Sequence, residues 1–189
     1  MSDASRDLCG LVLAAGAGTR FGGPKALARM SDGTPWIARA VGTLRDAGCR
    51  RIVVTLGAGV DEARSLVPAD AEIVFVADWA AGLSASLRAG LIAAEAAEAA
   101  VILPVDTPAT PVAAVRRVVE ASPDLMIALV QAVYRGAPGH PVLIGSAHFA
   151  TLASGISGDV GARPYLRAHG ALEVECADLW SGADMDTRP

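Results

Sequence analysis

Short aliphatic runs alternate with longer amphipathic segments along most of the chain, and this alternation limits the fold more than any other feature. The runs are bounded by Gly, Pro or Asp and predict strands at residues 8–14, 50–57, 71–77 and 100–105. The longer segments predict helices at residues 34–48, 83–98 and 110–122. Continuously apolar runs such as the first and the fourth are typical of parallel strands that helices cover on both faces. The alternation therefore predicts a layered α/β fold with a mostly parallel sheet.

A different pattern begins after the third predicted helix. Residues 124–134 predict a fifth strand, which is followed by the Gly- and Pro-rich sequence RGAPG and by another extended segment that ends at Gly145. This order predicts a hairpin rather than a further helical crossover. The hairpin would add an antiparallel part to the otherwise parallel sheet.

Composition and charge narrow the classes of partner. The chain has 189 residues, a length that predicts one domain spanning residues 1–189. Hydrophobic residues make up 52% of it but aromatic residues only 4%, so Ala, Val, Leu and Ile must fill the core. The formal net charge is -4, which leaves no general basic surface for nucleic acid or an anionic membrane. An anionic ligand must therefore be bound by local groups.

The cysteines and the N-terminal segment predict a cytoplasmic protein. Cys9, Cys49 and Cys176 are odd in number and lack CxxC spacing, so neither a disulfide framework nor a zinc site is indicated. Asp3 and Asp7 lead into an apolar run of about eight residues, which is too short for the core of a signal peptide and its cleavage site. No segment reaches the roughly 20 apolar residues that a membrane helix needs. We therefore expect a location in the reducing cytoplasm.

The stretch at residues 11–28, LVLAAGAGTRFGGPKALA, joins an apolar strand to a glycine-rich loop with two cations. Glycines let backbone N–H groups approach phosphate oxygens, and Arg20 and Lys25 can neutralise phosphate charge. Two common nucleotide-binding patterns fail here. A GxGxxG pattern starting at Gly16 finds Phe21 at its third glycine, and a proline interrupts the Walker pattern Gly-Lys-Ser/Thr. A solvated surface turn is the alternative, since a glycine-rich loop alone is a weak signal.

Several segments, spread over most of the chain, resemble the motifs of one enzyme family and occur in the same order as those motifs. The loop LAAGAGTRFGGPK is followed by DWAAGLSASLRAG, PVDTP, GHPVLI, GDVGARPYL and, near the end, DMDT. These segments resemble the motifs of the MobA-like nucleotidyltransferases and, most closely, those of the molybdenum cofactor cytidylyltransferases. The resemblance implies a Rossmann-like nucleotidyltransferase fold of the GT-A-like kind, with three α/β/α layers, a mostly parallel sheet and an antiparallel addition. It also implies Mg2+ as the cofactor and a nucleoside triphosphate (NTP) as the donor.

By this resemblance, the glycine-rich loop and the segment after the third strand bind the nucleotide. Residues 14–16 would line the base and ribose, residues 18–20 would meet the triphosphate, and Lys25 would contact the α-phosphate and the charge that develops during transfer. Gly82 and Ser84 stand at a predicted helix start, where N–H and hydroxyl groups can bind nucleotide oxygens, although N-capping explains a serine equally well. The full nucleotide-binding set implied is Leu13, Ala14, Ala15, Gly16, Gly18, Thr19, Arg20, Lys25, Gly82 and Ser84.

Two carboxylates are implied to bind the metal. Asp106 follows an apolar strand, where a carboxylate can bind Mg2+ through one oxygen and leave positions for phosphate and water. An Asx turn before Pro108 is the alternative. Near the C-terminus, Asp184 and Asp186 lie on the same side of an extended segment, and Asp186 matches the second metal ligand of the family. An acidic tail is the alternative there. The residues implied to act in catalysis are Arg20, Lys25 and Asp106.

The segments GHPVLI and GDVGARPYL are implied to surround the acceptor. His140 follows a glycine-rich turn, and a structural role is the alternative for a lone histidine. The second segment can bind a polar pterin edge and a phosphate. Asp159 can accept hydrogen bonds, Arg163 can donate them, and Gly161 between them leaves space. Asp159 could instead cap a helix that begins near Gly161.

The activity implied is Mg2+-dependent transfer of a nucleoside monophosphate to a molybdopterin-type acceptor, the molybdenum cofactor, with release of pyrophosphate. CTP is the expected donor because the loop reads Leu-Ala-Ala-Gly, where the guanylyltransferases tend to have Leu-Ala-Gly-Gly. A molybdoenzyme would receive the product. The alternatives are GTP or another NTP with a different phosphorylated acceptor, such as a sugar phosphate or phospholactate. Asp78 and Thr107 depart from the family pattern and leave open a non-catalytic molybdenum cofactor carrier or chaperone.

Overall fold

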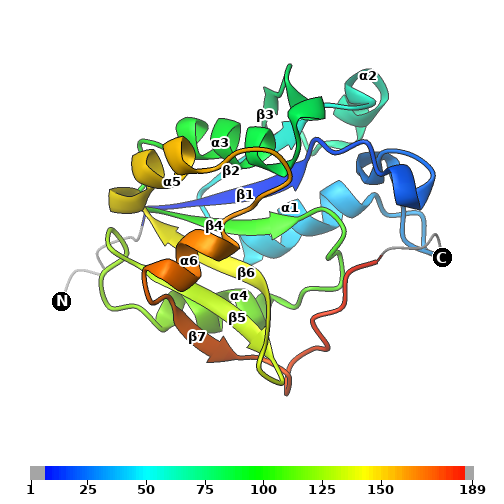
Figure 1. Ribbon diagram of the computed structural model, residues 1–189. Coiled ribbons are helices and arrows are strands. Elements are labelled where there is room, and N and C mark those ends of the chain that lie inside the picture. Colours follow the sequence, from blue (N-terminus) through cyan, green and yellow to red (C-terminus); the bar gives the residue numbers. More distant parts are fainter. Residues whose placement is uncertain (1–6, 186–189) are drawn as a thin grey trace.

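The computed structural model describes residues 7–185, and these form a seven-stranded sheet between two layers of helices (Figure 1). The order of the strands across the sheet is β3-β2-β1-β4-β6-β5-β7. In chain order the strands are β1 (Leu8–Ala14), β2 (Arg51–Leu56), β3 (Glu72–Phe75), β4 (Ala99–Pro104), β5 (Leu129–Tyr134), β6 (Ala137–Gly145) and β7 (Leu172–Glu175).

Most strand pairs are parallel, and the antiparallel part lies inside the sheet. β1 pairs in parallel with β2 and β4, β2 with β3, and β5 with β7. β6 pairs antiparallel with both β4 and β5. The predicted hairpin is therefore confirmed as β5 and β6, and its second strand joins the hairpin to the parallel strands.

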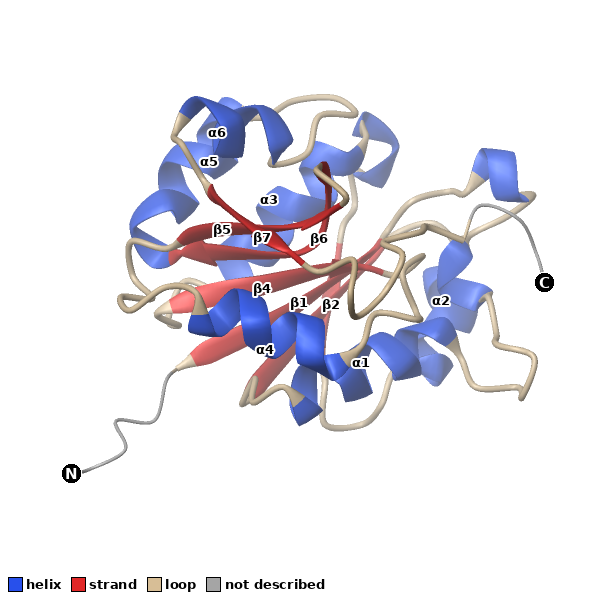
Figure 2. Cartoon of the chain, turned by 90° about the horizontal axis from the view of Figure 1, so that it is seen from below, coloured by secondary structure: helices blue, strands red, loops and turns tan. Residues whose placement is uncertain are grey.

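The helices form two layers. They are α1 (Trp36–Asp46), α2 (Val60–Ala63), α3 (Leu83–Ala93), α4 (Val112–Glu120), α5 (Phe149–Gly155) and α6 (Arg163–Ala168). Figure 2 shows α1 and α4 on one face of the sheet and α3, α5 and α6 on the other. The predicted three-layer α/β/α arrangement is confirmed.

The apolar strands supply core residues to both layers. All seven residues of β1 are buried. Val12 packs in the cluster that holds Trp36 of α1 and Val115 of α4, whereas the adjacent Leu11 packs in the cluster that holds Leu87 of α3. Side chains alternate between the two faces of a strand, so a strand covered on both faces must be apolar throughout.

Several elements differ from the sequence predictions: β5 begins at Leu129 rather than at residue 124, α2 and α5 are not among the predicted helices, and α3 and β7 differ as follows. α3 ends at Ala93 rather than at residue 98, because the chain turns there and the Glu98 N–H donates to the Asp7 carbonyl at 3.0 Å, which brings the next residues into β4 beside β1. β7 is not among the predicted strands. Its sequence LEVE alternates apolar and charged residues because β7 is a short, mostly exposed edge strand.

The cysteines belong to the core. Cys9, Cys49 and Cys176 are free and buried. Burial raises the pKa of Cys9 to about 11 and that of Cys49 to about 12, so both are protonated thiols at neutral pH. Within residues 7–185, none of the helices combines the length and the apolar character needed to cross a membrane.

Candidate functional site

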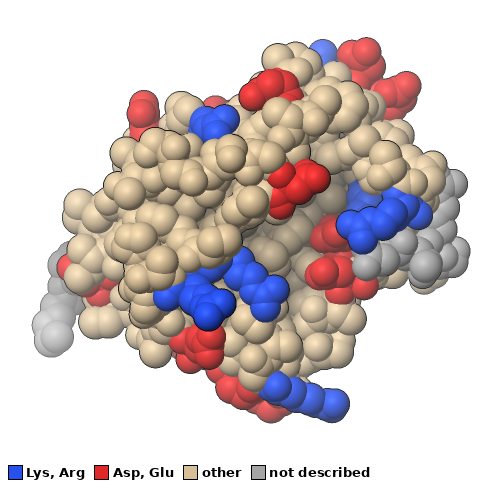
Figure 3. Space-filling model, viewed as in Figure 1, with Lys and Arg blue, Asp and Glu red and all other residues tan. Residues whose placement is uncertain are grey.

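A cleft of about 530 Å3 opens at the carboxyl ends of β1 and β4. The register of these parallel strands pairs Leu13 with Pro104, and the Val105 N–H donates to the Leu13 carbonyl at 3.0 Å. The glycine-rich loop after β1 and the segment containing Asp106 after β4 therefore leave the sheet at the same edge. Ligands of open α/β sheets bind at such an edge. Figure 3 shows the hollow with basic side chains on two sides of it and acidic side chains between them.

The cleft brings together nearly all the residues expected to bind the nucleotide. It is lined by Leu13, Ala14, Ala15, Gly16, Gly18, Thr19, Arg20, Lys25 and Gly82. Ser84 is buried, with 2% of its surface exposed, and does not line the cleft. Ser86, two residues further along α3, does line it. Ser86 carries the same hydroxyl two positions further along the helix, and the motif gave no reason to choose it over Ser84.

The glycines of the loop have two different roles. Gly18 has φ 59°, and its carbonyl accepts hydrogen bonds from the N–H groups of Phe21 at 2.9 Å and Gly23 at 3.1 Å. A Cβ at Gly18 would collide with the Gly23 carbonyl, so this glycine is required to close the loop. A Cβ at Gly16 would meet no atom within 4 Å. Gly16 therefore leaves open space next to the cleft.

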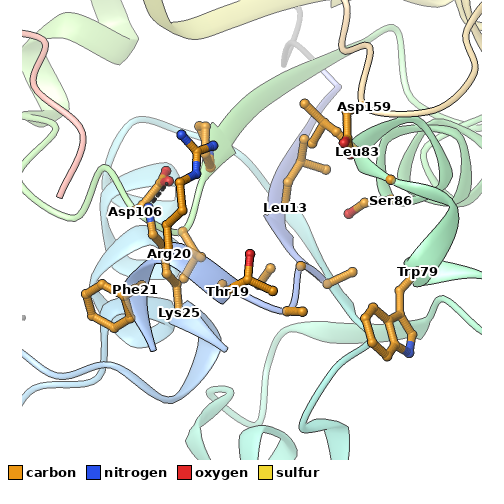
Figure 4. A pocket seen from close by; sticks show the side chains of 18 of the residues that line it. Leu13, Thr19, Arg20, Phe21, Lys25, Trp79, Leu83, Ser86, Asp106 and Asp159 are labelled. Carbon is orange, nitrogen blue, oxygen red and sulfur yellow. Dashed lines mark hydrogen bonds and ion pairs between the residues drawn. The ribbon is translucent and has the colours of Figure 1, made fainter. Parts of the chain in front are cut away.

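An ion pair lies at one end of the cleft. Lys25 Nζ is 2.9 Å from Asp106 Oδ2, and the two side chains are only 16% and 24% exposed. The Lys25 ammonium is also 5.8 Å from the ring centroid of Phe21, and the Phe21 ring packs against Trp36 at 5.4 Å. Phe21 thus links Lys25 to the core, a positioning role that the sequence pattern did not indicate. Arg20 is exposed at the same end (Figure 4).

The C-terminal segment reaches the same end of the cleft. The Met185 N–H donates to the Asp106 carbonyl at 2.8 Å, which brings Asp184 and its neighbours close to Asp106. Upstream, the Tyr134 ring packs edge-on against Trp180 at 5.4 Å. Asp186 lies outside the described residues. Within residues 7–185, no group of three or more His, Cys, Asp or Glu side chains is placed to hold a metal ion.

The carboxylate of Asp106 suits a hard divalent cation. It stands at a strand end in the cleft beside a cation, Lys25, and oxygen ligands are those that Mg2+ and Mn2+ prefer. The C-terminal segment runs next to it as far as Met185. The donor chemistry present therefore fits the metal that the resemblance implies, with Asp106 as a ligand.

The four residues expected to bind the acceptor lie in four different places. Asp159 lines the main cleft, at the end away from Lys25 (Figure 4). A Cβ at Gly161 would lie 3.0 Å from the Leu83 side chain, so Gly161 packs closely against the start of α3. Arg163 lines a separate, shallow cavity of about 430 Å3 together with Arg167.

His140 lies on β6 and does not line the cleft. Its carbonyl accepts a hydrogen bond from the Tyr134 hydroxyl at 2.7 Å. Burial lowers the pKa of His140 to about 4, and the negative charge of Asp106 opposes this shift only in part. The imidazole is therefore neutral at pH 7. A neutral imidazole can donate or accept a hydrogen bond but adds no positive charge next to Asp106.

The loop that carries Asp159 closes against the start of α3. The Ser84 N–H donates to the Gly158 carbonyl at 3.1 Å. Gly82 has φ 107°, and a Cβ there would collide with the Gly158 backbone and the Asp159 carboxylate. Gly82 is thus required for the two loops to meet.

Replacing Gly82 by alanine is expected to lower the free energy of unfolding by about 1–3 kcal/mol, because the new Cβ is strained at this φ and displaces the loop at residues 158–159. Thermal unfolding measures the loss. Gly42→Ala is the matched control, since a Cβ at Gly42 of α1 would meet no atom within 4 Å. Equal melting temperatures of the two variants would show that the close approach at Gly82 is not a constraint.

The comparisons with known proteins agree with this geometry. The family model described as MobA-like NTP transferase domain matches residues 10–174. The chain is 33% identical over 187 residues to the nicotine blue oxidoreductase of Paenarthrobacter nicotinovorans, in an alignment that covers 94% of this chain and 91% of that protein.

Solved structures share the fold. Rv0371c from Mycobacterium tuberculosis H37Rv superposes with a TM-score of 0.81 at 26% identity, covering 97% of this chain and 95% of that chain. A complex of Rv0371c with manganese gives a TM-score of 0.75 over 90% of this chain and 88% of that chain, at 26% identity. A nucleotidyl transferase from Methanothermobacter thermautotroptrophicus has the same fold, with a TM-score of 0.76 at 22% identity over 96% of this chain and 92% of that chain.

Proposed function

The chain belongs to the MobA-like NTP transferase family, and from that premise we propose a specific reaction for it. The protein transfers a nucleoside monophosphate from an NTP, with CTP as the donor, to a molybdopterin-type acceptor and releases pyrophosphate. An anionic oxygen of the acceptor attacks the α-phosphorus, and the bond from that phosphorus to the bridging oxygen breaks. The electron pair leaves with pyrophosphate. The protein must therefore hold a highly charged donor and stabilise charge that moves during transfer.

The observation that carries the proposal is the placement of Lys25 and Asp106 beside the glycine-rich loop. Gly16 leaves space for phosphate oxygens, and Arg20 and Lys25 supply two positive charges at one end of the cleft in a chain whose net charge is -4. Lys25 binds the α-phosphate, and Arg20 binds the phosphates that leave. Each cation forms charge-assisted hydrogen bonds to phosphate oxygens.

Asp106, together with Asp186, holds the metal in this proposal. The manganese complex of the structural relative Rv0371c supports a divalent cation, which here is Mg2+. When bound, the metal neutralises triphosphate charge and favours the departure of pyrophosphate. Asp106 would hold the metal through its carboxylate, and the ammonium of the adjacent Lys25 would bind the α-phosphate.

The acceptor lies between the phosphate end of the cleft and α6. Arg163 binds an anionic group of the acceptor, and His140 offers it a neutral hydrogen-bonding group. Asp159 presents its carboxylate to the cleft next to the acceptor, and Gly161 lets this loop pack against the start of α3. The choice of CTP rests on the resemblance of the loop sequence Leu-Ala-Ala-Gly to that of the cytidylyltransferases, in which Ala15 replaces a glycine.

A redox activity is the second candidate, because the 33% identical relative is named an oxidoreductase. The loop argues against a dinucleotide cofactor bound in the usual way. Phe21 stands at the third glycine of the GxGxxG pattern, and its buried ring packs against Trp36 instead of leaving space.

Pyrophosphate release from each NTP, with Mg2+ and purified molybdopterin, is expected to occur fastest with CTP and to require both acceptor and metal. The same preparation is expected not to oxidise reduced nicotinamide cofactors. The proposal fails if no NTP yields pyrophosphate. Acceptor binding without pyrophosphate release would favour the carrier function, and nicotinamide oxidation would favour the redox function.

A further inference from the structure

The end of the cleft opposite Lys25 contains a buried pair of hydroxyl groups. Thr55 of β2 is 0% exposed, and Ser86 of α3 is 4% exposed. Their oxygens lie 2.7 Å apart. The Thr55 hydroxyl also lies 3.3 Å from the Val12 carbonyl, to which it donates. Ser86 lines the cleft (Figure 4), whereas Thr55 does not line it and contacts it only through Ser86.

The hydrogens on these hydroxyls limit the directions that the hydrogen bonds can take. A threonine hydroxyl has one hydrogen to donate. If Thr55 donates it to the Val12 carbonyl, the short contact with Ser86 is a hydrogen bond only when Ser86 is the donor. This direction makes both contacts hydrogen bonds, whereas donation from Thr55 to Ser86 would leave the contact with the Val12 carbonyl without a hydrogen. In this arrangement the Ser86 hydrogen points away from the cleft, and its oxygen offers only lone pairs to a ligand.

The other polar side chain at this end is also an acceptor. Asp159 lines the same cleft, and its carboxylate lies against Gly82, one helical turn before Ser86. An ionised carboxylate accepts hydrogen bonds and donates none. The remaining walls come from Leu13, Leu83 and the ring of Trp79, whose indole nitrogen is directed away from Ser86 (Figure 4). The other end combines the Asp106 carboxylate with two cations, Arg20 and Lys25, whereas this end offers a carboxylate and apolar walls. This end therefore suits the nucleoside, and the cationic end suits the triphosphate.

We propose that Thr55 is a positioning residue for base recognition, which it performs by holding Ser86 as a hydrogen-bond acceptor. Ser86 and Asp159 together then favour a base that turns an amino group toward them, because an amino group has two hydrogens to donate to two acceptors. Cytosine presents an amino group where uracil presents a carbonyl oxygen, and a carbonyl facing two acceptors leaves all three groups unpaired. This inference rests on the proposed function, because it assumes that the cleft holds an NTP.

The test compares the affinities of Mg-CTP and Mg-UTP, measured by titration calorimetry without acceptor. The wild-type protein is expected to prefer CTP by about tenfold, in line with the cost of an unpaired polar group. Thr55→Val keeps the shape of the side chain but frees the Ser86 hydrogen to point into the cleft. Its preference is expected to fall to about twofold, through tighter UTP binding as well as weaker CTP binding.

Three further variants separate positioning from simple destabilisation. Thr55→Ser keeps the hydroxyl and is expected to restore the preference for CTP. Thr43→Val removes another buried threonine hydroxyl, on α1 and outside the cleft, and is expected to leave the ratio unchanged. Ser86→Ala removes the acceptor itself and is expected to lower the preference even where Thr55→Val does not fold.

The outcomes distinguish this inference from the function beneath it. A wild-type preference that Thr55→Val and Ser86→Ala both leave intact would overturn the inference while leaving NTP binding in place. Equal wild-type affinity for CTP and UTP would overturn it in the same way. Binding of neither nucleotide would overturn the proposed function, and the inference with it.

Discussion

Lys25→Ala lowers turnover by about 10²- to 10³-fold, the usual loss when one donor to a developing charge is removed. Lys25 stands at the cationic end of the cleft, 16% exposed, and its ammonium is held between Asp106 and the Phe21 ring. If it binds the α-phosphate most strongly in the transition state, kcat falls far more than the affinity for NTP. Single-turnover kinetics and equilibrium NTP binding, measured on the same preparation, separate the two quantities.

Lys25 is the only lysine in the sequence, which allows a second readout. Amine-selective methylation modifies Lys25 and the N-terminal amine alone, and bound Mg-NTP is expected to protect Lys25. Arg39→Ala, which removes an exposed cation from α1, is the control and is expected to keep full turnover. Equal losses of kcat and NTP affinity in Lys25→Ala would reduce the role of Lys25 to ground-state attraction.

Asp106→Asn raises the Mg2+ concentration needed for half-maximal activity by at least about 10-fold, because an amide is a weaker ligand than a carboxylate for a hard cation. The substitution also removes the charge that pairs with Lys25. A change in rate alone would therefore not identify the metal ligand. The informative measurement is the position of the Mg2+ titration curve, with Mn2+ titrated in parallel.

Asp61→Asn is the control for this titration, since Asp61 lies on α2 outside the cleft. It is expected to leave the Mg2+ requirement unchanged. If Asp106→Asn titrates with Mg2+ as the wild-type protein does, Asp106 is not a metal ligand and its contact with Lys25 is structural.

The local features of the fold could be predicted from the sequence, and the long-range pairing could not. Continuous apolar runs indicated β1 and β4 because each side chain there must enter one of two cores. The hairpin of β5 and β6 was visible in its turn. The sequence around β6 does not indicate that β6 also pairs with β4. That pairing depends on which edge strand of the parallel sheet the hairpin packs against, and this is decided by contacts far apart in the sequence. β7 was not predicted, because a short, exposed edge strand contains few of the apolar residues from which strands are predicted.

The candidate site shows the same division. The glycine-rich loop could be predicted because its residues are close in sequence and its phosphate chemistry needs glycine and cations together. The hydrogen bond between Thr55 and Ser86 could not be predicted, because the two residues are 31 positions apart and neither residue belongs to a motif that indicates the other. The placement of Ser84 inside the protein follows from its backbone bond to Gly158, a contact between two loops that no spacing rule describes.

The central claim is that the α-phosphate of an NTP is transferred and pyrophosphate leaves. The direct measurement incubates the protein, Mg2+ and molybdopterin with CTP that carries a radioactive label in either the α- or the γ-phosphate. The proposed reaction places the α-label in the pterin product and the γ-label in pyrophosphate. Label from the γ-phosphate in the pterin product or in orthophosphate, or no transfer of the α-label, would contradict it.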